Sequence, residues 1–308
     1  MTGPILLALL PIVLLIGLGH VMRRGDFLSE SFWPQAERLS YFVLLPALFI
    51  HGLATANMSD VPMGPLAAAL MLSILVVAGL LFAIGPLVAS DGPTFTSVFQ
   101  GGIRINSYAG LTAAVELFGP SAVPLAAVAA AVLVPTVNIL SVLAFARHGT
   151  AARPTVLGVL RGVATNPLVV GCAIGMALQA SGLGLPVGFA SVLKSLGQAA
   201  LPLGLLCVGA ALRWDALGRG LKHTLTASFV KFALMPLATI AACLWFGLDA
   251  RSATVAVLFQ ALPTASSSYI LARQLGGDAG LMAGIISFQT VLAMITLPAA
   301  LLLMQAVM

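Results

Sequence analysis

Charged residues are scarce in this chain. They make up 7% of its 308 residues, whereas hydrophobic residues make up 60%. Because a soluble globular protein carries about 25% charged residues, this composition excludes a water-soluble fold. The apolar runs are long and continuous instead of short and alternating, so they predict membrane-spanning helices and argue against a transmembrane β-barrel. The sequence therefore predicts an all-α polytopic membrane protein in contact with the lipid bilayer.

Cysteine and histidine are also rare, and neither belongs to a catalytic or metal-binding motif. The three cysteines lie far apart inside apolar runs without CxxC spacing, which is typical of core-packing thiols. The histidines lie near predicted membrane edges, at His20, His51, His148 and His223. Neither a GxSx–His pair nor an HExxH helix occurs in the chain. We therefore expect no enzyme, no metal site and no cofactor.

Long apolar runs dominate what is present. A membrane helix needs about 20 mostly apolar residues. With that length, ten spans are expected, at residues 4–22, 34–54, 62–89, 94–117, 121–146, 157–180, 186–211, 223–246, 251–275 and 279–306. No basic residue precedes the first span, so we expect it to be retained and not cleaved as a signal.

The basic residues are distributed unevenly between the two sides of the predicted membrane. Most loop bases fall on the side of the odd-numbered connectors, namely Arg23, Arg24, Arg38, Arg147, Arg153, Arg161, Arg213, Arg219 and Lys222. The even-numbered connectors hold only Arg251. Positive residues mark the cytoplasmic side, so both termini are expected on the outer side of a bacterial inner membrane. Bases confined to short loops do not predict a nucleic-acid partner.

The two halves of the chain resemble each other. Five predicted spans precede the polar loop RHGTAARP at 147–154 and five follow it. LLPALFIHG at 44–52 resembles ALPLGLLCVG at 200–209, and VFQGG at 98–102 resembles LFQAL at 258–262. With an odd number of spans in each half, the resemblance predicts a 5+5 inverted repeat, a common transporter architecture. The expected domains are residues 1–147 and 157–308, joined by a cytoplasmic connector at 148–156.

Spans 4 and 9 are each interrupted near the middle by polar and helix-breaking residues. GGIRINSYAG occupies 101–110, and LPTASSSYIL occupies 262–271. Glycine weakens a helix by about 1 kcal/mol relative to alanine, and proline removes an amide donor. Unsatisfied backbone in lipid is costly, so such breaks survive only where they line a cavity or are buried in protein. Paired broken helices therefore predict a substrate site at the membrane midplane.

The residue types at the two breaks indicate the charge of the substrate. A helix that restarts after a break presents amide donors and a partial positive charge. Arg104 adds a full charge, at a depth where arginine costs about 2.5–3.5 kcal/mol unless it faces a polar interior. A small organic anion is therefore the expected substrate. The predicted substrate-binding residues are Arg104, Asn106, Ser107, Tyr108, Pro263, Thr264, Ser266, Ser267 and Ser268. Arg104 contacts the substrate or, alternatively, only supports the break.

Further polar residues are predicted to support this site. Gln100 and Gln260 lie one turn before the two breaks, where we favour contacts with the backbone over contacts with substrate. Asn138 and Gln289 lie on the following spans and are expected to line the interior. Lys194 either attracts anions into an outer vestibule or extends to the membrane interface. Lys231, in span 8, has no partner that the sequence identifies.

These segments resemble the auxin efflux carrier family, whose members include bacterial relatives of the plant PIN-FORMED carriers. The resemblance rests on RINSYAGL at 104–111 and LPTASSSYILARQLGGD at 262–278, with NPLVVGCAIGMALQASGLGLP at 166–186 and ISFQTVLAMITLP at 286–298. It implies broken helices 4 and 9 that cross, a scaffold of helices 1, 2, 6 and 7, and a moving core of helices 3–5 and 8–10. It also implies elevator-type alternating access, often in a homodimer. Family substrates are auxin-like monocarboxylates or malate- and malonate-like dicarboxylates.

The chain departs from the plant carriers in two ways. The plant carriers have a proline at both breaks, whereas this chain has Pro263 at one and Ile105–Asn106 at the other. The long cytoplasmic loop of many plant members is absent. Arg104 is an addition that favours a more anionic substrate.

Two questions stay open at this stage. A sodium-coupled organic anion symporter of the bile-acid symporter type shares the ten spans and crossed helices, and it would bind Na+ through oxygens of Gln260, Ser266–Ser268, Thr290 and Asn138. A channel is a further alternative. Proton coupling normally uses an intramembrane carboxylate or histidine, and every acid of the chain lies in or near a connector. The sequence therefore favours potential-driven export or anion exchange.

Overall fold

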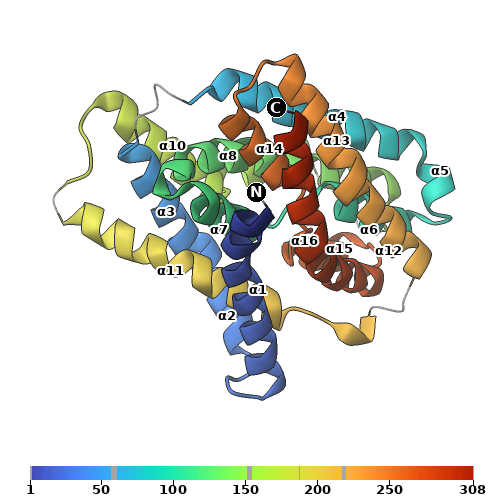
Figure 1. Ribbon diagram of the computed structural model, residues 1–308. Coiled ribbons are helices and arrows are strands. Elements are labelled where there is room, and N and C mark those ends of the chain that lie inside the picture. The colour runs from blue at the N-terminus through green and yellow to red at the C-terminus, as the bar shows by residue number, and fades with distance from the viewer. Residues whose placement is uncertain (1, 57–60, 151–154, 187, 217–219, 308) are drawn as a thin grey trace. The chain divides into compact units, whose positions relative to one another are not determined.

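The computed structural model describes the chain except residues 1, 57–60, 151–154, 187, 217–219 and 308 (Figure 1). Within that described part, every regular element is a helix. Among the described residues, six helical segments are long and apolar enough to cross a membrane: Phe32–Ala54, Met63–Ala83, Pro120–His148, Phe189–Ala210, Leu221–Trp245 and Ala279–Val307. The prediction of an all-α, multi-pass membrane protein is confirmed at this level. The ten spans and the inverted repeat stay predictions.

The helices follow one another with short connections. In chain order they are α1 (Thr2–Arg24), α2 (Phe32–Leu39), α3 (Leu45–Ala54), α4 (Met63–Ala83), α5 (Gly85–Val88), α6 (Gly92–Ile103), α7 (Ser107–Phe118) and α8 (Val123–His148). They continue with α9 (Val156–Ala164), α10 (Pro167–Ser181), α11 (Phe189–Ala210), α12 (Leu221–Phe229), α13 (Met235–Trp245), α14 (Ala250–Gln260), α15 (Ser267–Leu275) and α16 (Ala279–Val307). π-Helical turns join α2 to α3 at Ser40–Leu44 and α12 to α13 at Val230–Leu234.

Polar caps explain where several helices begin. The Asp91 side chain accepts a hydrogen bond from the Thr94 amide at the start of α6. The Asp249 carboxylate does the same for the amides of Arg251 and Ser252 at the start of α14. Burial alone would raise the pKa of Asp249, but its hydrogen bonds with Ser252 and Arg251 outweigh burial and hold the pKa below its ordinary value.

The predicted span 157–180 is wrong as a single helix. α9 ends at Ala164 and α10 begins at Pro167. Proline cannot donate an amide and is favoured in the first helical turn. The Asn166 side chain caps the new helix by accepting from the amides of Leu168 and Val169. The same kind of division occurs in predicted span 3, where α4 ends at Ala83 and α5 begins at Gly85, beside Pro86.

The described chain forms two compact units, each drawing on both halves of the sequence. Unit 1 contains Met1–Met63, Ser107–Ala131 and Ala164–Ala211. Unit 2 contains Gly64–Asn106, Val132–Val163 and Leu212–Met308. These two units are defined by packing and do not correspond to the two sequence repeats. The repeats stay predictions, and so does the assignment of a scaffold and a moving core.

Glycines allow close helix contacts inside unit 1. α11 packs along α1 and α3, and α3 also packs along α10. A Cβ atom added at Gly209 would collide with the backbone carbonyl of Ile16, and one at Gly19 would collide with the backbone of Leu206. Between α10 and α3, a Cβ atom at Gly171 would lie 3.0 Å from the Cα atom of Pro46. These helices therefore approach each other through their backbones.

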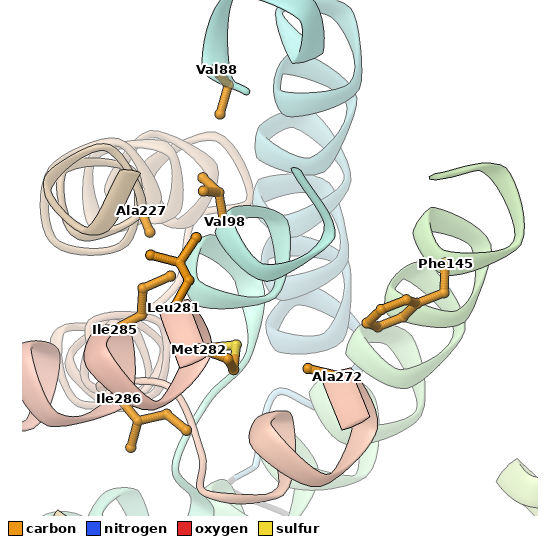
Figure 2. Close-up of a cluster of buried hydrophobic side chains, with 9 residues drawn as sticks. All are labelled: Val88, Val98, Phe145, Ala227, Ala272, Leu281, Met282, Ile285 and Ile286. Atoms are coloured by element: carbon orange, nitrogen blue, oxygen red, sulfur yellow. The ribbon is translucent and has the colours of Figure 1, made fainter. Parts of the chain in front are cut away.

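A hydrophobic cluster fills the interior of unit 2 (Figure 2). Its buried members come from α5, α6, α8, α12, α15 and α16: Val88, Val98, Phe145, Ala227, Ala272, Leu281, Met282, Ile285 and Ile286. α16 packs against α6, α12, α14 and α15. α6 precedes the first predicted break and α15 follows the second, and both helices pack against α16.

Candidate functional site

Both predicted helix breaks are present in the structure. α6 ends at Ile103, Arg104 is extended with φ −73° and ψ 156°, and α7 begins at Ser107. α14 ends at Gln260, and α15 begins at Ser267 after irregular residues 261–266. We refer to residues 104–106 and 261–266 together as the double break. Both segments belong to unit 2.

The two segments of the double break are hydrogen-bonded to each other. The Asn106 amide donates to the Pro263 carbonyl at 2.9 Å. Asn106 is 2% exposed, and a buried backbone amide outside a helix needs an acceptor. Each break therefore supplies a backbone partner that the other lacks. The sequence predicts two related breaks, and the structure shows that they form one feature.

Gln289 of α16 joins the two segments a second time. Its Nε2 atom donates to the Gly101 carbonyl at 2.9 Å, and its Oε1 atom accepts from the Thr264 amide at 3.0 Å. The side chain is fully buried. Gln289 thus satisfies one backbone group at each break, which is a positioning role.

Two hydroxyl groups form hydrogen bonds at the second break. The hydroxyl groups of Thr264 and Ser268 are 3.0 Å apart, and the Thr264 hydroxyl also donates to the Gln100 carbonyl at 3.5 Å. Both side chains are buried. They link the irregular segment to the first turn of α15 and to the end of α6. Ser266 and Ser267 are partly exposed, so their hydroxyl groups are more accessible than those of Thr264 and Ser268.

Arg104 provides the positive charge of the double break. It is 7% exposed, and its guanidinium donates to Asn138 Oδ1 at 2.9 Å and to Ser267 Oγ at 3.0 Å. Both acceptors are neutral, and these two hydrogen bonds orient the guanidinium. Ser267 is the first residue of α15, where the helix dipole places a partial positive charge. Two positive potentials therefore coincide, and together they favour an anion.

The amides at the start of α15 are less available than the sequence predicts. The Ser268 amide donates to the Ala265 carbonyl and the Tyr269 amide to the Ser266 carbonyl, each at 3.0 Å. The turn that precedes α15 uses these donors because its own carbonyls lie within reach. The attraction for an anion therefore depends on Arg104 and the helix dipole more than on free amides of Ser268 and Tyr269.

The side chains of Gln260 and Gln100 contact the neighbouring helices α4 and α16, respectively. The Gln260 amide group donates to Ser73 Oγ at 3.1 Å and to the Leu70 carbonyl at 3.4 Å, both on α4. The Gln100 amide group lies 4.0 Å from Met282 Sδ on α16. Both side chains are fully buried. Ser73 is a supporting residue that the sequence reasoning missed, although it is one of few polar residues in α4.

Three of the predicted site residues lie in unit 1 and not with the others in unit 2. They are Ser107, Tyr108 and Lys194. The Tyr108 ring packs against α11, where a Cβ atom added at Gly204 would collide with it. Lys194 is exposed on α11. Inside unit 1, Tyr108 is therefore a packing residue, and a substrate role for these three residues stays a prediction.

The hydrogen bonds of three sodium candidates involve different helices. Gln260 bonds to α4, and the Thr290 hydroxyl donates to the Ile286 carbonyl of its own helix at 2.7 Å. The Asn138 side-chain oxygen accepts from Arg104. Among the residues that the structure describes, no group of three or more His, Cys, Asp or Glu side chains could hold a metal ion.

The comparisons with known proteins agree with a transport role. A sequence model of the family described as "Membrane transport protein" matches residues 152–301. A search of curated protein sequences finds no match for the chain. The matched region contains the second break and Gln289.

Proposed function

Because residues 152–301 carry the domain of the auxin efflux carrier family, we propose that this membrane transporter moves small organic anions and binds them at the double break. The substrate is a carboxylate, either an auxin-like monocarboxylate or a malate- or malonate-like dicarboxylate. The direction is efflux from the cytoplasm. The proposal is a binding and transport function without a catalytic step.

One observation supports the anion specificity above all others. The Arg104 guanidinium lies at the first residue of α15, held by the neutral oxygens of Asn138 and Ser267. A carboxylate at this place would accept hydrogen bonds from arginine and gain from the helix dipole. A cation there would meet two positive potentials.

The transport movement is proposed to be of the elevator type. The division between the two compact units falls between Asn106 and Ser107, at the first break itself. An extended segment absorbs changes in backbone angles more easily than a continuous helix does. Unit 2, which holds Arg104 and the second break, is the proposed moving part, and a homodimer of unit 1 is the proposed frame.

A carboxylate-binding screen tests the proposal. The purified protein is screened by thermal shift against malonate, malate and indole-3-acetate, and positive ligands are then assayed for uptake into proteoliposomes. Arg104→Gln should abolish the shift and the uptake, whereas Arg104→Lys should retain charge but lose the two-point geometry and bind about tenfold more weakly. Arg273→Gln, at an exposed site on α15, is the matched control and should behave like the wild type.

Three outcomes would overturn the proposal. If Arg104→Gln keeps the wild-type thermal shifts, the anion does not bind at the double break. If binding or uptake requires Na+, the sodium-coupled symporter is the correct alternative. Linear, non-saturable flux would indicate a channel.

A further inference from the structure

Lys231 is a buried amine that the proposed anion site does not use. It lies in the π-helical turn Val230–Leu234 that joins α12 to α13. Its side chain is 0% exposed, and its Nζ atom has no hydrogen-bond partner among the residues that the structure describes. π-Helical turns often occur at functional sites, and an ionisable residue inside a membrane span indicates a function unless a partner explains it.

The surroundings of Lys231 place it beside the helix that leads to Arg104. The π-helical turn packs against α6 and α16. A Cβ atom at Gly102 would lie 2.9 Å from Val230 Cγ1, and one at Gly101 would lie 3.0 Å from Ala227 Cβ. The glycine pair of α6 therefore brings the backbones of α6 and the Lys231 helix close together, directly before the double break.

Lys231 also lies at the depth of the double break. At about 1.5 Å per residue, it is about 15 Å along its helix from Leu221, and Gly101 is about 14 Å along α6 from Gly92. Both helices begin on the predicted cytoplasmic side. With the span expected at residues 223–246, the amine is therefore expected inside the membrane, and its complete burial keeps it from extending to either interface.

No negative charge faces Lys231 from the helices around it. α4, α6 and α16 contain no titratable residue within their helical ranges. Asp91 and Asp278 precede α6 and α16 and cap the amides of Thr94 and Leu281. The other ionisable groups on these elements are Arg104 after α6, Lys222 and His223 at the start of α12, and Cys243 on α13.

Structural roles do not account for an amine in this place. A buried polar group without a partner costs free energy, and an isolated buried ammonium costs far more. Replacing it by an apolar group of similar shape is neutral or stabilising. Lys231 therefore contributes nothing to packing that methionine would not, and its charge can form cheaply only when a negative charge comes close.

We propose that Lys231 is the proton-binding site that couples proton movement to anion transport. The inference rests on the proposed function, because the incoming carboxylate supplies the negative charge. The neutral amine takes one proton from water on the loading side as the anion binds, giving an ammonium. On the opposite side, the anion leaves and the ammonium releases the same proton to water. A monocarboxylate then crosses with no net charge, and a dicarboxylate carries one net negative charge.

This inference changes the expected energetics of export. Each anion that leaves the cytoplasm takes one proton with it, so its own concentration gradient, and not an inward proton gradient, drives the efflux. The sequence offers no intramembrane carboxylate or histidine, so it favours transport that is insensitive to a pH gradient. A buried lysine without a partner can bind and release a proton as a buried carboxylate does. The lysine changes between neutral and positive, whereas a carboxylate changes between negative and neutral. Burial, which only the structure reveals, distinguishes this lysine from the others in the chain.

Proteoliposomes that contain trapped pyranine test the coupling. Malonate is added outside, and its uptake and the lumenal pH are recorded together; indole-3-acetate is used if malonate is not transported. Because indole-3-acetic acid crosses lipid by itself, empty liposomes are the reference. In the wild type, about one proton should enter with each anion, and malonate affinity should fall about tenfold per pH unit at alkaline pH, because binding takes up one proton.

Lys231→Met removes the amine and keeps the side-chain volume. It should bind malonate with an affinity that does not change with pH, and proton entry per anion should fall at least about tenfold. Its unfolding temperature should equal or exceed that of the wild type, which shows that the variant folds. Lys222→Met, at an exposed position on the same helix, is the control and should keep the coupling.

The outcomes separate the two proposals. If no carboxylate binds or crosses in the wild type, the proposed function fails. If the carboxylate crosses and the wild type and Lys231→Met show the same proton entry, the coupling role of Lys231 is wrong while anion transport stands. Proton entry that disappears in Lys231→Met but persists in Lys222→Met supports the inference.

Discussion

Single polar side chains hold the double break together. Gln289 bonds one backbone group at each break, the Gly101 carbonyl and the Thr264 amide. The sequence placed Gln289 on the span after the second break as a residue that lines the interior. Its hydrogen bonds show that it also connects the two breaks, and this structural role can be tested separately from substrate binding.

The substitution Gln289→Leu should destabilise the protein strongly. It leaves two buried backbone groups without partners, at a cost of about 1–3 kcal/mol each. The midpoint of thermal unfolding in detergent should fall clearly below that of the wild type. Gln274→Leu, at an exposed position on α15, should leave the midpoint nearly unchanged. Equal midpoints for Gln289→Leu and the wild type would contradict this structural role.

At the scale of whole helices, close packing is set by glycines that the sequence pattern alone does not single out. Gly17 and Gly19 lie two residues apart on α1, yet only Gly19 faces α11, where an added Cβ atom would collide with the backbone of Leu206. Gly209 is the corresponding contact on α11, against Ile16. The contact makes α1 and α11 a tightly packed pair within unit 1.

The substitution Gly209→Ala should therefore separate α11 from α1. The added methyl group has no space, and overpacking of this kind costs about 1–3 kcal/mol. Gly17→Ala is the control, since no heavy atom lies within 4 Å of an added Cβ atom there and alanine favours a helix. The midpoint of thermal unfolding should fall below that of the wild type in Gly209→Ala and rise slightly above it in Gly17→Ala. A stable Gly209→Ala protein would show that α1 and α11 are not packed through this glycine.

For the whole molecule, the distribution of basic loops predicts the membrane orientation. With the bases of the odd-numbered connectors in the cytoplasm, both termini are expected outside. A C-terminal alkaline phosphatase fusion should be active in bacterial cells, and a C-terminal green fluorescent protein fusion should be dark. A fluorescent C-terminal fusion would show that the C-terminus lies in the cytoplasm and that the predicted orientation is wrong. The proposed efflux direction would then need a new test.

The sequence by itself determined the class of protein and the location of the breaks. A chain with 7% charged residues and long apolar runs cannot form a water-soluble core, and Pro263 acts locally on the segment that contains it. Gly101 and Gly102 stay helical within α6, and the first break follows them at residues 104–106. The charge of Arg104 is likewise the basis, already in the sequence, of the proposal that the substrate is an anion. The two central breaks follow from neighbouring residues and could be predicted, whereas the division between α9 and α10 was not predicted although Asn166 and Pro167 mark it.

Only the tertiary structure decided which polar groups meet. The bonds from Asn106 to Pro263, from Arg104 to Asn138 and from Gln260 to Ser73 join residues far apart in the chain. Tyr108 is predicted as a site residue, and the structure adds that its ring packs on Gly204 inside unit 1. Lys231 had no identified role until its complete burial showed that its charge is costly. Hydrogen bonding and burial depend on side chains from several helices, and one sequence does not specify how those helices pack.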